Sequence, residues 1–361
     1  MSKKVLIVLL GAIGDVTRGL SLAVRLKRAW PDSHVTWAVE PISRPLVEGH
    51  PAIDRVVVFE RSRGLRGYRD FIVQIQSSTY DITLDLQRHF KSGVTSYLSR
   101  ANRRVGFHYR NAKELNWIFN NEHIGPVENF SAKIDHYHKF GDYLSLPSMG
   151  PLEFDLPSSG NADERISALL GRYQNGPDAE ASFAALLLGS SWPSRFWSAE
   201  HYRRVIVDLH SRYKITSLLV GGAGEEHIAN EILAGQETLP AINLVRQTTL
   251  SELPALFRRA RFALGSDCGP MHIAAASGIP VISLWGSTSP KRSAPYGSEE
   301  LVLQSTIGCS PCYRRRCPGL GTQCMRDIPP EAVLAQVERL FASAERVLKS
   351  ADYPEARNEI L

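Results

Sequence analysis

The stretch Lys4-Val5-Leu6-Ile7-Val8-Leu9-Leu10-Gly11-Ala12-Ile13-Gly14-Asp15-Val16 decides the fold class of this chain. Its opening run is apolar and rich in β-branched residues, which predicts a buried strand. Two glycines then allow a tight turn, and a helix is predicted to begin at Asp15. The glycines lack the G-x-G-x-x-G spacing of a dinucleotide-binding turn, which disfavours a dinucleotide oxidoreductase.

The same alternation of strand and helix continues through the first half of the chain. Predicted strands cover residues 4–10, 34–39, 55–59 and 81–86, and predicted helices cover residues 15–30, 68–78 and 91–100. Strands that alternate with helices form βαβ units and a parallel sheet. The alternation fades near residue 145, where Leu146-Pro147-Ser148-Met149-Gly150-Pro151 supplies breakers, so a domain boundary is predicted there.

A second set of elements follows this boundary. Predicted strands cover residues 184–188, 215–220, 242–245, 261–264 and 280–285, and predicted helices cover residues 198–212, 225–234, 250–259, 270–277 and 330–349. We therefore predict an α/β protein with a Rossmann-like domain over residues 1–155, a linker over 156–180, a second Rossmann-like domain over 181–330, and a C-terminal helix and tail over 331–361. Two such domains create a cleft, and ligands bind beyond the carboxyl ends of their strands.

Composition and charge narrow the class of protein. The 361 residues are 43% apolar and 22% charged, as in soluble globular proteins. Asp15 and Arg18 interrupt the apolar N-terminal run, and no run is long enough to span a membrane, so we expect a cytoplasmic protein. Residues 1–150 hold 21 Lys and Arg against 14 Asp and Glu. This excess indicates an anionic partner or a solvated basic surface, and no nucleic-acid-binding module is present.

A second turn carries the features of an anion site. Gly265-Ser266-Asp267-Cys268-Gly269-Pro270-Met271-His272 joins a predicted strand to a predicted helix, with Pro270 near the first helical position. Free backbone N–H groups at such a helix start bind phosphate well. Asp267 and His272 flank the turn, either as ligand contacts or as ordinary turn and helix residues.

Two further turns in the second half suit parts of a nucleotide sugar. Ser190, Ser191 and Arg195 follow a predicted strand, and a guanidinium offers paired donors to a diphosphate. Gly221-Gly222-Ala223-Gly224-Glu225 places a carboxylate after a glycine-rich turn, which suits ribose or sugar hydroxyls. In the first half, Asp15 is either a carboxylate that stabilises the helix dipole or a general base facing the cleft.

Taken together and in order, these motifs resemble glycosyltransferase family 9, the ADP-heptose:lipopolysaccharide heptosyltransferases. The resemblance runs from about residue 4 to 333 and rests on the following segments: Gly11-x-x-Gly14-Asp15, Ser194-Arg195-x-Trp197, Gly221-Gly222-x-Gly224-Glu225, Thr248-x-Leu250-x-Glu252-Leu253, Asp267-x-Gly269-Pro270-Met271-His272-x-Ala274-Ala275, Trp285-Gly286-x-Thr288-x-Pro290 and Pro295-Tyr296-Gly297. The first domain looks most like heptosyltransferase I, on Val39-Glu40, residues 50–56, Asp85-Leu86-Gln87 and Lys91-Ser92.

The resemblance implies a GT-B fold and an inverting, metal-independent transfer of heptose from ADP-heptose to the Kdo/heptose inner core of lipopolysaccharide. Asp15 falls on the family's general base. The implied donor-binding residues are Ser190, Ser191, Arg195, Glu225, Asp267, Gly269, Pro270, Met271 and His272. The implied acceptor-binding residues are Gly14, Arg61, Arg63, Arg66, Gln87 and Lys91, with the three arginines placed in a glycine-containing loop. The acceptor would be met at the cytoplasmic face of the inner membrane, through peripheral association.

Three positions depart from the family pattern. Arg195 replaces a commoner Lys, Ser198 stands where Pro often follows Trp, and Cys268 replaces a usual Thr hydroxyl. These departures keep two alternatives open. One is a family member that uses another nucleotide sugar or acceptor, and the other is a non-catalytic protein that binds nucleotide sugars.

A cysteine cluster lies near the end of the second domain. Cys309, Cys312, Cys317 and Cys324 form a C-x2-C-x4-C-x6-C pattern. Four close thiolates can hold a structural zinc ion or an iron–sulfur cluster, and the alternative is four reduced thiols in a surface loop. No cofactor is expected to be required for catalysis.

Overall fold

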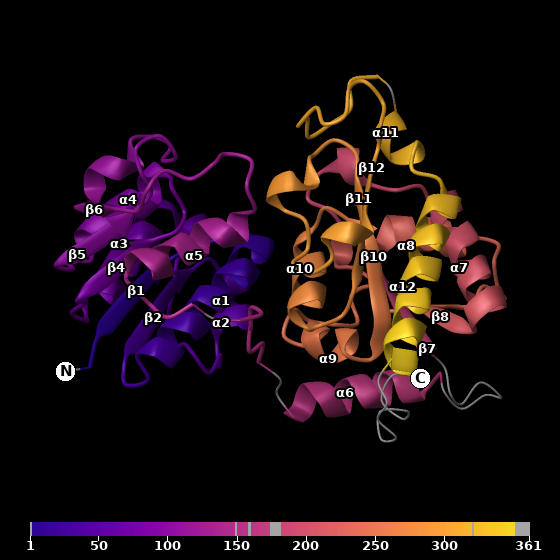
Figure 1. Cartoon of the computed structure of the whole chain (residues 1–361), viewed down its shortest axis with the longest axis horizontal. Helices are drawn as coiled ribbons and strands as arrows, with labels where there is room; N and C mark the ends of the chain where they lie inside the picture. The colour runs from indigo at the N-terminus through magenta and orange to yellow at the C-terminus, as the bar shows by residue number, and fades with distance from the viewer. Residues whose placement is uncertain (1, 149, 158–159, 174–181, 320, 351–361) are drawn as a thin grey trace.

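The computed structural model describes residues 2–148, 150–157, 160–173, 182–319 and 321–350. Two α/β halves lie side by side, each built on one parallel sheet (Figure 1). The predicted fold class, two Rossmann-like domains facing across a cleft, is confirmed. Parts of the predicted linker (158–159 and 174–180) and of the tail (351–361) lie outside the described residues.

The first sheet has the strand that opens the chain at its centre. Its strands are, in spatial order, β3 (Arg55–Val58), β2 (His34–Val39), β1 (Lys4–Val8), β4 (Ile82–Asp85), β5 (Arg103–Gly106) and β6 (Glu122–His123). Every pair is parallel, and β1 is buried on both faces apart from Lys4. The helices of this half are α1 (Ile13–Ala29), α2 (Arg44–Val47), α3 (Gly64–Gln76), α4 (Phe90–Leu98) and α5 (Lys133–Tyr143), with 3-10 turns η1 (Pro41–Ser43), η2 (Arg61–Arg63) and η3 (Asn116–Phe119).

The second sheet repeats this arrangement. Its strands are, in spatial order, β12 (Val302–Gln304), β11 (Val281–Trp285), β10 (Ala260–Ser266), β7 (Ser182–Leu187), β8 (Ile215–Val220) and β9 (Ala241–Asn243). The helices of this half are α6 (Gly160–Gly171), α7 (Ala199–Tyr213), α8 (Glu226–Leu233), α9 (Leu253–Phe257), α10 (Gly269–Ala276), α11 (Gln323–Arg326) and α12 (Pro330–Ser350), with 3-10 turns η4 (Pro193–Arg195), η5 (Ala223–Glu225), η6 (Pro290–Arg292) and η7 (Glu299–Leu301).

Several elements differ from the sequence prediction. Strand β1 ends at Val8, before the predicted end, and α9 is shorter than the predicted helix. Helices α5 and α6 and strands β5, β6 and β12 had no predicted counterpart, because their apolar patterns are short or irregular. Helix α6 lies within the predicted linker and packs against α9, where Arg165 pairs with Glu252.

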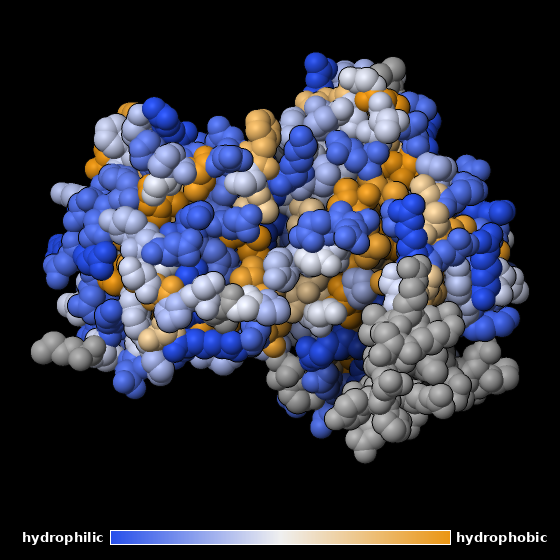
Figure 2. Space-filling model, viewed as in Figure 1, coloured by the Kyte–Doolittle hydropathy of each residue, from blue (hydrophilic) through white to orange (hydrophobic). Residues whose placement is uncertain are grey.

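The contact between the halves is made chiefly by α1 and α10, which face one another in Figure 1. A single buried apolar cluster includes residues of both halves, so the inner ends of the two units share a core. The outline of the molecule is notched between the halves (Figure 2). Among the described residues, no helix combines the length and apolar character needed to cross a membrane.

Candidate active site

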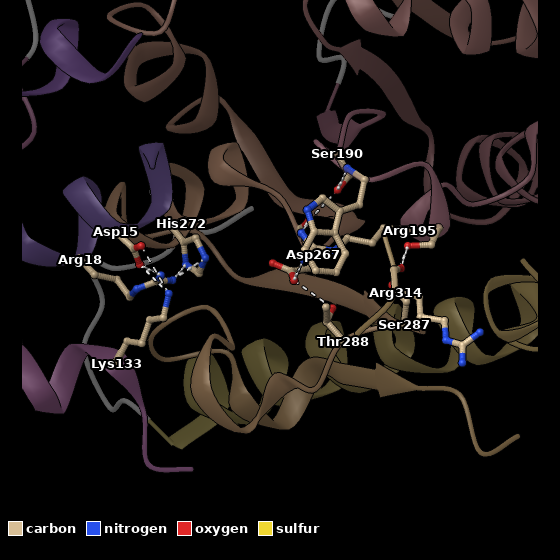
Figure 3. Close-up of polar contacts among 12 residues, drawn as sticks. Asp15, Arg18, Lys133, Ser190, Arg195, Asp267, His272, Ser287, Thr288 and Arg314 are labelled. Atoms are coloured by element: carbon tan, nitrogen blue, oxygen red, sulfur yellow. Dashed lines mark hydrogen bonds and ion pairs between the residues drawn. The ribbon is translucent and has the colours of Figure 1, made fainter. Parts of the chain in front are cut away.

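Asp15 lies in the first turn of α1, where the strand–turn–helix pattern placed it. Its backbone N–H donates to the carbonyl of Ala12 at 2.9 Å, which closes that turn. The carboxylate points toward α5, and Lys133 Nζ lies 2.9 Å and 3.3 Å from its two oxygens (Figure 3). Arg18, one turn further along α1, also pairs with Asp15. The carboxylate is therefore held by two cations at the inner edge of the first half.

The surroundings of Asp15 set its protonation state. Burial disfavours the charged carboxylate, but the attraction and hydrogen bonds of Lys133 and Arg18 outweigh it, so the pKa of Asp15 lies well below its usual value. Burial in turn lowers the pKa of the Lys133 ammonium, although Asp15 partly opposes that change. Asp15 is thus ionised near neutral pH and able to accept a proton.

His272 joins this cluster from the second half. Arg18 Nη1 lies 2.6 Å from Nε2 of His272, which is buried in the first turn of α10. Burial and the nearby charge of Arg18 lower the pKa of His272 well below its usual value, although Asp15 opposes this. A neutral imidazole accepts the hydrogen bond from Arg18, so Asp15, Arg18 and His272 link the two halves (Figure 3).

Two glycines allow α1 and α10 to approach this closely. A Cβ atom at Gly14 would lie 2.4 Å from Cδ2 of His272, and one at Gly269 would lie 2.8 Å from Cβ of Ile13. The glycines of both motifs therefore serve contact between the halves as well as access for a ligand. Sequence reasoning considered the tight turn and the approach of a ligand that such glycines allow, but not this contact between the halves.

Arg195 and Asp267 form a second polar group across the cavity (Figure 3). Arg195 Nη2 lies 3.2 Å from Asp267 Oδ2, and its Nη1 donates to the Asp267 carbonyl at 3.0 Å. The guanidinium also lies 4.1 Å above the Trp192 ring. Thr288 Oγ1 donates to Asp267 Oδ2 at 2.9 Å, which fixes the Asp267 carboxylate. The fixed carboxylate in turn holds the Arg195 guanidinium in place. Burial lowers the pKa of Arg195, while Asp267 opposes that change.

Glu225 occupies a space that two glycines create. Its side chain packs against Gly189 and Gly221, where a Cβ atom would lie 2.7 Å from the nearest atom of Glu225. Its Oε2 accepts a hydrogen bond from the Gly222 N–H at 2.7 Å. The carboxylate is thereby fixed beside the ends of β7 and β8.

A cavity of about 710 Å³ lies between these groups. Most of the residues predicted to bind the donor line it, namely Ser190, Ser191, Arg195, Glu225, Asp267, Gly269, Pro270 and His272, together with Asp15 and Gly14. Met271 is the exception. Its side chain is fully buried in the core shared by the halves and does not line the cavity, so the prediction that Met271 binds the donor is corrected for its side chain.

A second cavity of about 220 Å³ adjoins the first. Asp15 and Lys133 line both cavities, so they stand at the junction. Gln87 lines the second one, as predicted for an acceptor residue, and its Oε1 accepts a hydrogen bond from the Leu10 N–H at 2.6 Å. Four cations that sequence reasoning did not assign to the site also line it, namely Arg88, Lys113, Lys133 and Arg292.

The other residues predicted to bind the acceptor lie outside both cavities. Arg61 and Arg63 form η2 and Arg66 lies in the first turn of α3, so the predicted loop is corrected to a helical segment. All three side chains are exposed. Lys91 Nζ lies 4.9 Å above the Phe59 ring. No signal in the sequence distinguished these cations from Arg88 and Arg292, because only the folded chain brings the latter two together.

The four clustered cysteines are free thiols, of which Cys309 is exposed and Cys324 is buried. Burial and the proximity of the other three raise the pKa of Cys324. Among the described residues, no group of three or more Cys, His, Asp or Glu side chains is arranged to hold a metal ion. Cys268 lies apart and lines the larger cavity, where burial raises the pKa of its thiol to about 12.

Comparison with known proteins identifies the family and the fold. Residues 68–322 match the profile of glycosyltransferase family 9 (heptosyltransferase). The chain is 27% identical to lipopolysaccharide core heptosyltransferase OpsX of Haemophilus influenzae, over 83% of this chain and 84% of that protein. It superimposes on a family 9 glycosyltransferase of Veillonella parvula with a TM-score of 0.80 at 19% identity, covering 95% and 98% of the chains. For E. coli heptosyltransferase WaaC with ADP, the TM-score is 0.72 at 22% identity, covering 93% and 99%.

Proposed function

The chain belongs to glycosyltransferase family 9, and from this premise we propose that it transfers heptose from ADP-heptose to the inner core of lipopolysaccharide. The observation that carries the proposal is the placement of Asp15. It lies at the junction of two cavities, one lined by Arg195 and the start of α10, the other lined by cations. A base between a donor site and an acceptor site is what glycosyl transfer requires.

The larger cavity suits a nucleotide diphosphate sugar. Its volume of about 710 Å³ falls in the usual range for small-molecule sites. Arg195 and the N–H groups at the start of α10 face it and would bind the diphosphate. Glu225 lies at the far wall beside Gly221 and Gly222, where it would accept hydrogen bonds from ribose hydroxyls. The similarity to a heptosyltransferase bound to ADP supports adenine as the base.

The proposed reaction inverts the anomeric centre. An acceptor hydroxyl attacks the anomeric carbon of heptose from the face opposite ADP, and Asp15 takes the hydroxyl proton. The bond between the anomeric carbon and the diphosphate oxygen breaks as the new glycosidic bond forms. A positioned base contributes about 10²–10⁴-fold to such a rate.

The leaving diphosphate gains negative charge as this bond breaks. Arg195 and the dipole of α10 would offset that charge, because both are fixed in place before the reaction. We therefore propose that transfer needs no metal ion. Activity that is unchanged by EDTA supports this point, and activity that falls with EDTA and returns with a divalent cation contradicts it.

The acceptor is proposed to be met at a membrane surface. Exposed apolar side chains of α4 and the η3 segment form one surface, because the rings of Phe90 and Tyr97 both contact Phe119, at 5.2 Å and 6.5 Å between centroids. Trp117 and Ile118 are exposed beside them. Arg104 lies 5.6 Å from the Tyr97 ring, which adds positive charge suited to anionic lipid.

Two measurements test the proposed function. Incubation with ADP-heptose and lipopolysaccharide core acceptors should release ADP and add one heptose to the product mass. Sugar transfer only from another nucleotide sugar, with release of its nucleoside diphosphate, or binding without turnover, would instead support one of the two alternatives. Sedimentation with anionic vesicles tests the surface, where Trp117→Ser with Ile118→Ser should weaken binding and Val207→Ser, an exposed apolar residue on α7, should not.

A further inference from the structure

The smaller cavity has an unusual balance of charge. Four cationic side chains line it (Arg88, Lys113, Lys133 and Arg292), and Asp15 is its only acidic lining residue within the described part of the chain. Lys133 already pairs with Asp15. No carboxylate among the described residues forms an ion pair with Arg88 or Arg292. The cavity therefore holds positive charge that the protein itself does not neutralise.

Arg88 and Arg292 are the strongest indications of a ligand. Burial lowers the pKa of Arg88, and the nearby charge of Arg292 lowers it further. The Nε of Arg292 is buried and makes no hydrogen bond. Bringing two cations together in a partly buried space without an anion is unfavourable. A bound anion would offset this cost.

The backbone conformation of Arg88 also indicates a functional site. This residue has a φ of 70°, a left-handed conformation that side chains other than glycine rarely adopt. The side chain lines the cavity, and its guanidinium lies 5.0 Å from the Phe107 ring. Backbone strain of this kind gathers at functional sites.

The position of the cavity identifies the ligand as part of the acceptor. The cavity meets the donor-side cavity at Asp15 and Lys133. Arg292 comes from η6 of the second half, and its neighbour Ser293 lines the donor-side cavity. An anion held here would therefore share a cavity wall with Asp15, the proposed base.

Resting on the proposed function, we infer that Arg88 and Arg292 bind the carboxylate of an acidic sugar unit in the acceptor. Guanidinium groups offer paired donors that match a planar carboxylate. A volume of about 220 Å³ suits one sugar unit better than a longer chain. The exposed Arg61, Arg63 and Arg66 do not reach this cavity, so acceptor recognition is assigned to a different set of cations from the one the sequence indicated.

Single substitutions test this assignment kinetically. Arg88→Gln and Arg292→Gln should each raise the KM for an acceptor that carries the carboxylate by about 10–100-fold, because a charged hydrogen bond is lost. The KM for ADP-heptose should stay within a factor of about two of the wild-type value. Lys291→Gln removes an adjacent, exposed cation that lines neither cavity and should leave both constants unchanged. Arg292→Lys should recover part of the loss.

Modified acceptors distinguish carboxylate from phosphate. Reduction of the acceptor carboxyl to an alcohol should weaken the wild-type enzyme but affect Arg88→Gln and Arg292→Gln little further. Removal of acceptor phosphates should affect wild type and variants equally. An unchanged acceptor KM in both variants overturns the assignment, and so does a loss that follows the phosphate. Melting temperatures of the variants show whether they are folded.

A binding measurement separates this inference from the proposed function. Calorimetric titration of the protein with the acidic acceptor oligosaccharide, without donor, should detect binding that Arg88→Gln weakens. If no heptose is transferred but this binding is present and sensitive to Arg88, only the proposed function fails. If heptose is transferred and neither arginine matters, only the carboxylate site fails.

Discussion

Lys133 Nζ on α5 lies 2.9 Å and 3.3 Å from the two carboxylate oxygens of Asp15 on α1. This pair places a cation directly on the residue proposed to act as the base. It keeps Asp15 ionised, but it also lowers the proton affinity of the carboxylate. A general base needs that affinity in order to take a proton. Lys133 also lines the smaller cavity, so an acceptor carboxylate bound there would compete with Asp15 for the positive charge of Lys133. Acceptor binding would then raise the basicity of Asp15 when a proton must be taken.

Replacement of Asp15 by Asn should lower the turnover number by about 10²–10⁴-fold, because the amide cannot accept the proton. Binding of ADP should be retained, since ADP is proposed to contact Arg195 and α10 instead. Steady-state ADP release and ADP titration measure the two effects. Near-normal turnover of a folded Asp15→Asn protein would exclude the base assignment.

Replacement of Lys133 by Met should make activity more sensitive to acid. In the wild-type protein the low pKa of Asp15 keeps the carboxylate ionised well below neutral pH. Without Lys133 the effect of burial is less strongly opposed, so the pKa of Asp15 rises and its protonation begins at higher pH. The acidic limb of the plot of kcat/KM against pH should therefore move to higher pH. An unmoved limb would show that Lys133 does not set this pKa.

Replacement of Arg195 by Ala should raise the KM for ADP-heptose and reduce kcat by about 10²–10³-fold, because a fixed donor to the developing diphosphate charge is lost. The acceptor KM should change little. Arg203→Ala is a control, since Arg203 is half-buried on α7, lines neither cavity, and donates only to the Glu231 carbonyl among the described residues. Equal losses in both variants would count against a specific role for Arg195.

Replacement of Gly14 by Ala should lower the free energy of unfolding by about 1–3 kcal/mol, because its Cβ atom would lie 2.4 Å from the His272 ring. Chemical denaturation measures this change. His272→Ala in the same chain removes the obstructing ring and should reduce the additional cost of the alanine at residue 14. Gly224→Ala is the control, since no atom lies within 4 Å of the added Cβ.

Acid should destabilise the protein through histidines whose pKa is lowered in the folded chain. Burial and the charges of Arg88 and Arg292 lower the pKa of His136 to about 4, and burial and Arg25 lower that of His138 to about 4. Between that value and the usual histidine pKa of about 6.5, the unfolded chain binds more protons than the folded one. Stability therefore falls as the pH decreases through this range. Melting temperatures at about pH 7 and pH 5 should differ less in His136→Gln than in wild type.

Much of the fold could be predicted locally. The central strands of both sheets have continuous apolar runs, α1, α7 and α12 have amphipathic patterns, and Pro270 marks the start of α10, so these elements appear within a few residues of their predicted positions. Helix α5 was missed because Lys133–Tyr143 carries four charged residues and two histidines without a clear apolar stripe. That omission hid Lys133, which proved to be one of the two cations that pair with Asp15.

The sequence by itself determined the strand–turn–helix units and the residues placed at their carboxyl ends. Asp15, Arg195, Glu225 and Asp267 were found in this way, because local patterns decide where strands end and helices begin. Only the tertiary structure decided which cations surround the site. Arg18 and His272 are 254 positions apart, and Arg88 meets Arg292 only when the halves pack through Gly14 and Gly269. Contacts between distant segments leave no periodic trace in a single sequence, so the sequence indicated Gln87 but only packing revealed the cations around it in the smaller cavity.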